Sequence, residues 1–152
     1  MRTTLIAVGR LRRSLRPPCD DYLRRVNRYG PVAERELREG PSSRPPAERR
    51  AVEGERVLAA VPERATLVAL DATGEAWTSE ELAAQLDRWR LAARPVALAI
   101  GGASGHDPAV LERADRLWSL GPLTLAHEIA RLVVLEQWYR AWTILRGEPY
   151  HK

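Results

Sequence analysis

Four polar side chains near the C-terminus have the chemistry that proton transfer and charge stabilisation require. Glu136 and Arg140 lie four residues apart in a segment with helical periodicity, and Tyr150 and His151 stand near the end of the chain. A carboxylate or an imidazole can accept a proton, and a guanidinium can stabilise developing negative charge. The same spacing also fits a plain helical ion pair between Glu136 and Arg140, worth roughly 0.2–0.5 kcal/mol. An aromatic residue and a histidine at the terminus suggest a tail that docks rather than frays.

Two glycine-containing segments follow apolar stretches and are candidates for holding a ligand against the backbone. The first, Gly101–Gly105, follows the strand pattern PVALAI, and the second, 118–127, reads WSLGPLTLAH. In open parallel α/β sheets, ligands bind at the carboxyl ends of strands, where glycines allow close approach. The first segment lacks the Lys-Ser/Thr of a P-loop and the spacing of the Rossmann fingerprint. A tight turn therefore remains open for the first segment, and a simple strand-to-helix connection for the second.

A basic segment follows the first strand pattern and suits contact with phosphates. Its arginines are Arg10, Arg12, Arg13 and Arg16. A solvated charged loop is the alternative interpretation. The surrounding half of the chain is also basic, with fifteen basic and nine acidic residues over 1–66, against nine and eleven over 67–152. Twenty-three of the 24 basic residues are arginine, which a coding preference for arginine explains.

Composition limits the class of protein. The chain of 152 residues has 45% hydrophobic and 29% charged residues, as expected of one globular domain spanning 1–152. One cysteine, Cys19, excludes an internal disulfide, and three histidines without clustered carboxylates predict no metal site. The apolar run Leu5–Val8 is too short for a signal-peptide core, and no membrane span is present, so we expect a cytoplasmic protein.

Strand patterns alternate with helical patterns, which predicts an α/β domain with a mostly parallel sheet covered by helices on both faces. Strands are expected at 2–8, 32–38, 67–71 and 95–100, with a turn at 73–74. Helices are expected at 20–29, at 47–61 with Ala51, Leu58 and Val61 buried, after the capping box at 78–81, from 107 through Leu117, and at 128–146.

The last helix is apolar on nearly all sides. Such a helix is buried on more than one side, and in a chain of this length the second side fits a partner subunit better than further core. The tryptophans at 89, 118, 138 and 142 lie in helical stripes, which favours core or interface positions over base stacking.

Four stretches together resemble the RlmH family of small SPOUT-class methyltransferases: LVALD at 67–71, IGGASG at 100–105, LWSLGPLTLAHEIARLVVLEQWYRAW at 117–142 and RGEPYHK at 146–152. This family methylates N3 of a pseudouridine in large-subunit ribosomal RNA. The resemblance implies an α/β SPOUT-type single domain with a C-terminal trefoil knot, a homodimer, S-adenosylmethionine as the methyl donor, and ribosomal RNA, within the assembled ribosome, as substrate.

The resemblance also implies roles for individual residues. The tail residues Tyr150 and His151 of one subunit would complete the active site of the other. The chemistry of the acceptor, rather than the resemblance, suggests the remaining roles: Arg140 is suited to stabilise the charge left when N3 loses its proton, His151 or Glu136 to take that proton, and His151 alternatively to position the substrate. Ala126 stands where the family commonly has proline, and the basic segment is arginine where the family is richer in lysine. The backbone in and beside the knot would hold S-adenosylmethionine through Leu70, Gly101, Gly102, Gly121, Pro122, Leu123, Thr124, Leu125 and Ala126.

Two other functions fit the same sequence. One is a SPOUT methyltransferase acting on another RNA, such as tRNA. The other is a non-catalytic RNA- or ribosome-binding module that keeps the fold without turnover.

Overall fold

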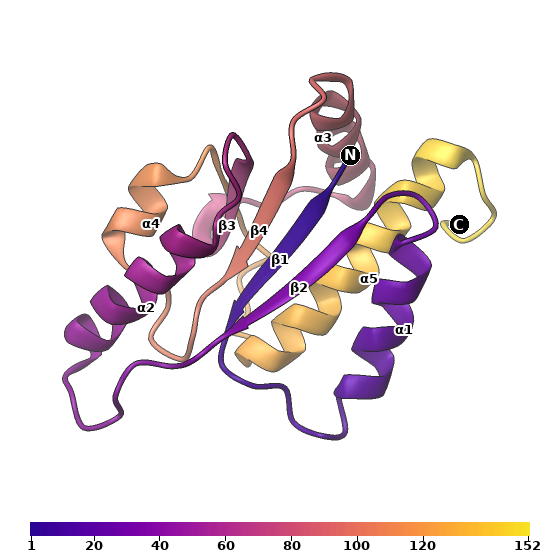
Figure 1. The fold of residues 1–152 in the computed structure, drawn as a ribbon. Coiled ribbons are helices and arrows are strands. Elements are labelled where there is room, and N and C mark those ends of the chain that lie inside the picture. The colour runs from indigo at the N-terminus through magenta and orange to yellow at the C-terminus, as the bar shows by residue number, and fades with distance from the viewer.

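The computed structural model describes all 152 residues, and its five strands form a single, entirely parallel sheet in the order β2-β1-β4-β3-β5 (Figure 1). The strands are β1 (Thr3–Val8), β2 (Val32–Leu37), β3 (Thr66–Glu75), β4 (Val96–Ile100) and β5 (Arg116–Trp118). The helices are α1 (Arg16–Val26), α2 (Pro46–Ala60), α3 (Ser79–Leu91), α4 (Pro108–Arg113) and α5 (His127–Arg146). The predicted α/β class with a parallel sheet is confirmed.

Helices cover both faces of the sheet, with α1, α3 and α5 on one face and α2 and α4 on the other (Figure 1). Successive residues of a strand point to opposite faces. On β1, Leu5 therefore packs in one core cluster with Trp138 of α5, and Ile6 packs in the second cluster with Val57 of α2. Because β1 and β4 are buried on both faces, they show as continuous apolar runs in the sequence.

Helix α1 begins earlier than predicted. It starts at Arg16 rather than near Asp20, with Pro17 and Pro18 in its first turn. Proline is tolerated there because the first N–H groups of a helix have no partner within it. The basic segment predicted as a loop is therefore a loop only as far as Leu15.

The predicted helix from 107 through Leu117 is wrong in its second half. Helix α4 ends at Arg113, and Leu117 and Trp118 belong to strand β5, so Trp118 is not part of a helical stripe. The predicted turn at 73–74 is instead part of β3, which continues to Glu75 past an irregularity. Gly74 permits this, since a Cβ there would lie 2.5 Å from the backbone of Leu117.

The buried face of α2 also differs from the prediction. Ala51 is exposed, and Leu58 and Val61 are half-buried. The residues that α2 buries are Glu53, Gly54 and Val57. No apolar stripe marks this face, because one of its members is a carboxylate and another has no side chain.

No helix of the chain is long and apolar enough to cross a membrane.

Candidate active site

A cavity of about 600 Å³ lies at the carboxyl ends of β3, β4 and β5. Its walls are those strand ends, the glycine turn after β4, the segment 119–126 and the first turn of α5. All nine residues predicted to contact the cofactor line this cavity: Leu70, Gly101, Gly102, Gly121, Pro122, Leu123, Thr124, Leu125 and Ala126.

The lining is suited to an uncharged or positively charged ligand. It contains no arginine or lysine, and its ionisable side chains are Asp71 and His127. Of the 19 lining residues, 10 are hydrophobic. A polyphosphate normally needs basic side chains or a dedicated glycine loop to balance its charge. The cavity therefore fits an aromatic or aliphatic ligand without phosphates.

The segment 119–126 offers free backbone groups to such a ligand. The N–H of Gly121 is hydrogen-bonded to Ser119 Oγ at 3.1 Å, but the N–H groups of Leu123, Thr124 and Leu125 have no partner within the chain. Gly121 has a φ of +111°, a conformation that L-residues with a side chain rarely adopt. The segment can thus bind the donors and acceptors of a flat ring such as adenine.

The four residues predicted to be catalytic come together at the other end of α5. Glu136 Oε1 accepts hydrogen bonds from Arg140 Nη2 at 2.6 Å and from the Tyr150 hydroxyl at 2.9 Å. His151 Nδ1 lies 3.4 Å from Arg140 Nη1, and His151 Nε2 lies 2.8 Å from Glu80 Oε1. The C-terminal tail is therefore docked, and the helical ion pair is part of a larger cluster.

Burial, hydrogen bonds and charges in this cluster shift the pKa values of Tyr150 and Arg140. Burial, together with hydrogen bonds to Tyr22 and Glu136, raises the pKa of Tyr150 far above its ordinary value. The hydrogen bond to Glu136 raises the pKa of Arg140 further. Tyr150 thus remains a neutral hydrogen-bond donor, and Arg140 remains a cation.

The cavity and this cluster are far apart within one chain. Ala130, in the first turn of α5, lines the cavity, and Arg140 is ten residues further along the same helix. A rise of 1.5 Å per residue separates them by about 15 Å. Figure 1 shows α5 running from the carboxyl edge of the sheet towards the C-terminus, away from that edge. One chain alone does not bring the predicted catalytic residues to the cavity.

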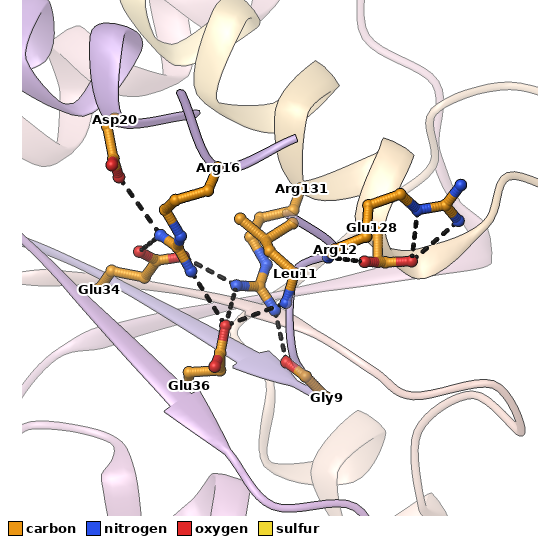
Figure 2. A network of polar contacts seen from close by, with 9 residues as sticks. All are labelled: Gly9, Leu11, Arg12, Arg16, Asp20, Glu34, Glu36, Glu128 and Arg131. Atoms are coloured by element: carbon orange, nitrogen blue, oxygen red, sulfur yellow. Dashed lines mark hydrogen bonds and ion pairs between the residues drawn. The ribbon is translucent and has the colours of Figure 1, made fainter. Parts of the chain in front are cut away.

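A network of ion pairs ties the segment after β1 to β2 and α5 (Figure 2). At its centre, Arg131 Nη1 donates to Glu34 and Glu36 at 2.8 Å each, and Nη2 donates to Gly9 O at 2.6 Å. Arg131 has no exposed surface. Sequence reasoning missed this residue, although a charged side chain in an otherwise apolar helix is itself a signal of a buried ion pair.

Two of the four predicted RNA-binding arginines belong to this network. Arg16 pairs with Glu34 at 2.6 Å and with Glu36 at 3.1 Å, and Arg12 pairs with Glu128 at 2.9 Å (Figure 2). Arg10 and Arg13 are exposed and form no ion pair within 4.0 Å. They are therefore the two arginines of the segment whose charge is free for a partner.

A carboxylate behind the glycine turn was also missed from the sequence. Glu53 of α2 is only 4% exposed, and its Oε1 accepts the N–H of Gly40 at 2.9 Å. A Cβ added to Gly102 would lie 3.0 Å from Glu53 Oε2, so this oxygen lies directly against the glycine that lines the cavity. Glu53 carries no local sequence signal, since it lies in a helix with many exposed charges.

Comparison with known proteins assigns this chain to a family. A family model described as "Predicted SPOUT methyltransferase" matches residues 1–151. The chain belongs to the SPOUT methyltransferase family. The resemblance seen in the sequence is thereby confirmed, and the parallel α/β sheet is the sheet of a SPOUT methyltransferase. The trefoil knot stays a prediction.

Relatives within the family are similar over their whole length. The chain is 45% identical over 153 residues to "Ribosomal RNA large subunit methyltransferase H" of Anaeromyxobacter sp. (strain Fw109-5), with both chains covered in full. It is 44% identical over 158 residues to the protein of the same name from Azotobacter vinelandii, again with both covered in full. A solved structure, a probable methylase family protein from Haemophilus influenzae Rd KW20, is 13% identical in sequence to this chain. The match covers 99% of this chain and 70% of the Haemophilus chain, with a TM-score of 0.53. That likeness shows the fold.

Proposed function

We propose that the chain transfers a methyl group from S-adenosylmethionine to N3 of a pseudouridine in large-subunit ribosomal RNA, in the cytoplasm. The observation that carries the proposal is the cavity at the ends of β3, β4 and β5, lined by all nine predicted cofactor residues and by no arginine or lysine. The names of its full-length relatives support ribosomal RNA as the substrate.

The cavity fits this methyl donor in four respects. The unpaired N–H groups of segment 123–125 can recognise adenine, and the apolar lining can pack against its ring. The absence of basic side chains suits a cationic sulfonium, and the carboxylate of Asp71 lines the same cavity. When bound, the sulfonium supplies an already electrophilic methyl group, so the protein needs only to position it and to activate the acceptor.

The acceptor nitrogen has to lose a proton during transfer. N3 of pseudouridine is an imide N–H between two carbonyls, and negative charge spreads onto their oxygens as the proton leaves. We assign Arg140 to stabilise that charge and His151 to accept the proton. Glu136 instead orients the site, because its Oε1 already accepts hydrogen bonds from Arg140 and Tyr150. As the nitrogen forms its bond to the methyl carbon, the S–CH3 bond breaks and a neutral thioether remains.

The cavity and the C-terminal cluster are about 15 Å apart within one chain, and a homodimer would bring the cluster of one subunit to the cavity of the other. We propose that the tail of one subunit, with Tyr150 and His151, reaches the cavity of its partner. Helix α5 offers the surface for this association, since a half-buried stripe at helical spacing runs along it. The stripe consists of Ile129, Leu132, Val133, Glu136, Gln137, Arg140 and Ile144.

RNA would approach the carboxyl edge of the sheet, where the cavity lies. Arg10 and Arg13 follow β1 at this edge and have no acidic partner within the chain. Such arginines neutralise phosphates and make binding sensitive to salt. A domain of this size buries little RNA by itself, so we expect both subunits, and the assembled ribosome, to contribute to recognition.

Methyl transfer to assembled ribosomes, isolated ribosomal RNA and tRNA tests the proposal directly. Labelled S-adenosylmethionine gives the rate on each substrate, and primer extension locates the product, because a methyl group on N3 blocks base pairing. We expect transfer to one site of the large-subunit RNA. Transfer to tRNA alone would show a different SPOUT substrate. A folded dimer that binds no S-adenosylmethionine in calorimetric titration would be a non-catalytic module.

A further inference from the structure

Glu53 is a buried carboxylate with an unused oxygen beside the cofactor cavity. Its side chain is 4% exposed, and Oε2 has no hydrogen-bond partner. The oxygen lies 3.0 Å from the position that a Cβ on Gly102 would occupy, and Gly102 lines the cavity. The carboxylate therefore lies directly behind the backbone of Gly102, which forms this part of the cavity wall.

No neighbouring cation neutralises this carboxylate. Among the arginines of α2, Arg50 donates to Ser104 O, and Arg56 donates to the carbonyls of Arg38 and Glu39. Arg49, one turn before Glu53, makes no hydrogen bond through its buried Nε. Glu53 therefore has one hydrogen bond, from the Gly40 N–H, and no cationic partner within 4.0 Å.

His106, the nearest histidine in the glycine turn region, does not supply the missing charge either. It is 7% exposed, and its Nε2 lies 3.1 Å from Ala99 O. Burial lowers the pKa of His106, and the nearby carboxylates of Asp71 and Glu53 do not reverse that shift. The imidazole is thus neutral at pH 7. Asp71 accepts hydrogen bonds from Thr73, and neither Asp71 nor Glu53 has a cation within 4.0 Å.

We propose that Glu53 makes the cavity discriminate between the positively charged methyl donor and the uncharged product that remains after transfer. This inference rests on the proposed function. S-adenosylmethionine and S-adenosylhomocysteine share the adenosine, the ammonium and the carboxylate, and they differ in the methyl group and the sulfonium charge. A buried carboxylate behind the cavity wall, with no cation beside it, attracts the cation through the poorly screened interior of the protein and does little for the neutral thioether. Loss of that attraction on methyl transfer favours release of the product and limits product inhibition.

Titration calorimetry of both ligands against the full-length protein tests the inference. In Glu53→Gln, the amide oxygen can still accept the N–H of Gly40, and the negative charge is removed while the size and shape of the side chain are kept. We expect Kd for S-adenosylmethionine to rise about tenfold, the size of one partly screened charge interaction, and Kd for S-adenosylhomocysteine to change less than about twofold. Glu55→Gln is the matched control, because Glu55 is exposed on the same helix and its loss gives the same net charge.

The two ligands separate an electrostatic role from a structural one. If both Kd values rise together, Glu53 only supports the glycine turn, and the inference is wrong. If neither changes, its charge does not reach the ligand, which also overturns it. If the wild-type protein binds neither ligand, the proposed function itself fails. Should Glu53→Gln not fold, Glu53→Met removes the charge without burying an unpaired amide, and the same ratio of Kd values decides.

Discussion

The guanidinium of Arg131, in the middle of a buried surface of α5, donates a hydrogen bond of 2.6 Å to the carbonyl oxygen of Gly9 at the end of β1. Four residues earlier on the same helix, His127 lines the cavity at the carboxyl ends of β3, β4 and β5, and a Cβ on Gly9 would lie 2.9 Å from its Nε2. The contact between Arg131 and Gly9 therefore fixes the first turn of α5, and with it one wall of the cavity, against the sheet.

Replacing Arg131 tests how much this network stabilises the fold. Arg131→Met removes a fully buried cation and its hydrogen bonds to Glu34, Glu36 and Gly9 O, and we expect the free energy of unfolding to fall by about 1.5–3 kcal/mol, because both carboxylates are partly exposed and keep Arg16 as a partner. Urea denaturation of the purified protein measures it. The control Arg146→Met, at the exposed end of the same helix, should change stability by no more than about 0.5 kcal/mol. Equal effects of the two substitutions would mean that the network is energetically neutral.

The ion pairs of the basic segment predict which arginines bind RNA. Arg10→Gln and Arg13→Gln should each reduce the slope of log K against log salt by roughly 1, because each removes a phosphate contact. Arg12→Gln and Arg16→Gln should leave that slope nearly unchanged, since both side chains are already paired with carboxylates. Fluorescence anisotropy with a stem-loop of large-subunit RNA, at several salt concentrations, measures the slopes. Equal slopes for all four variants would show that the pairs open when RNA binds.

Acid should destabilise the protein partly through Glu36. Burial on its own raises the pKa of Glu36, but hydrogen bonds from Arg131 and the Leu11 N–H outweigh it and hold the pKa below its ordinary value. A carboxyl group with a depressed folded-state pKa contributes stability that is complete above its unfolded pKa and is lost as pH falls through the folded one. Unfolding free energies should therefore fall more steeply below pH 4.5 in the wild type than in Glu36→Gln.

The comparison needs a variant that lacks a carboxylate but keeps the network. Glu63→Gln serves, because Glu63 is exposed and outside the ion pairs of Figure 2. Its stability should follow the wild-type pH profile between pH 6 and the acid transition. A profile of Glu36→Gln that superimposes on that of Glu63→Gln would contradict the role given to Glu36.

Mixed dimers test whether two subunits share one active site. His151→Ala removes the tail histidine, and Gly102→Val fills the cavity wall against Glu53, so each variant alone should be nearly inactive. A one-to-one mixture refolded together should regain roughly a quarter of wild-type methyl transfer, since half of random dimers are mixed and each has one intact site. Size-exclusion chromatography checks that both variants form dimers. Activity no higher than that of the separate variants would place the whole site within one subunit.

Local sequence patterns determined the elements that depend on neighbours in the chain. The capping box of α3 is one case: Thr78 Oγ1 accepts the N–H of Glu81 at 3.1 Å, and Glu81 Oε2 accepts the N–H of Thr78 at 2.7 Å. The end of α5 is another, because Gly147 adopts a φ of +67° that terminates a helix. The buried strands β1, β3 and β4 and the glycine turn after β4 were also predictable, since apolar runs followed by glycine mark strand ends in such sheets, whereas β5 lies where a helix was predicted.

The tertiary structure alone decided which charges meet. Arg131 and Glu34 are 97 residues apart in the sequence, and Arg12 and Glu128 are 116 residues apart, so no local sequence pattern predicts either ion pair. In the sequence, Glu53 cannot be distinguished from the exposed charged residues of α2. Only the packed structure shows that it lies against Gly102. The separation of the C-terminal cluster from the cavity is likewise a property of the folded helix. Sequence periodicity reports which face of an element is apolar, whereas the partner across that face is fixed only when the elements pack.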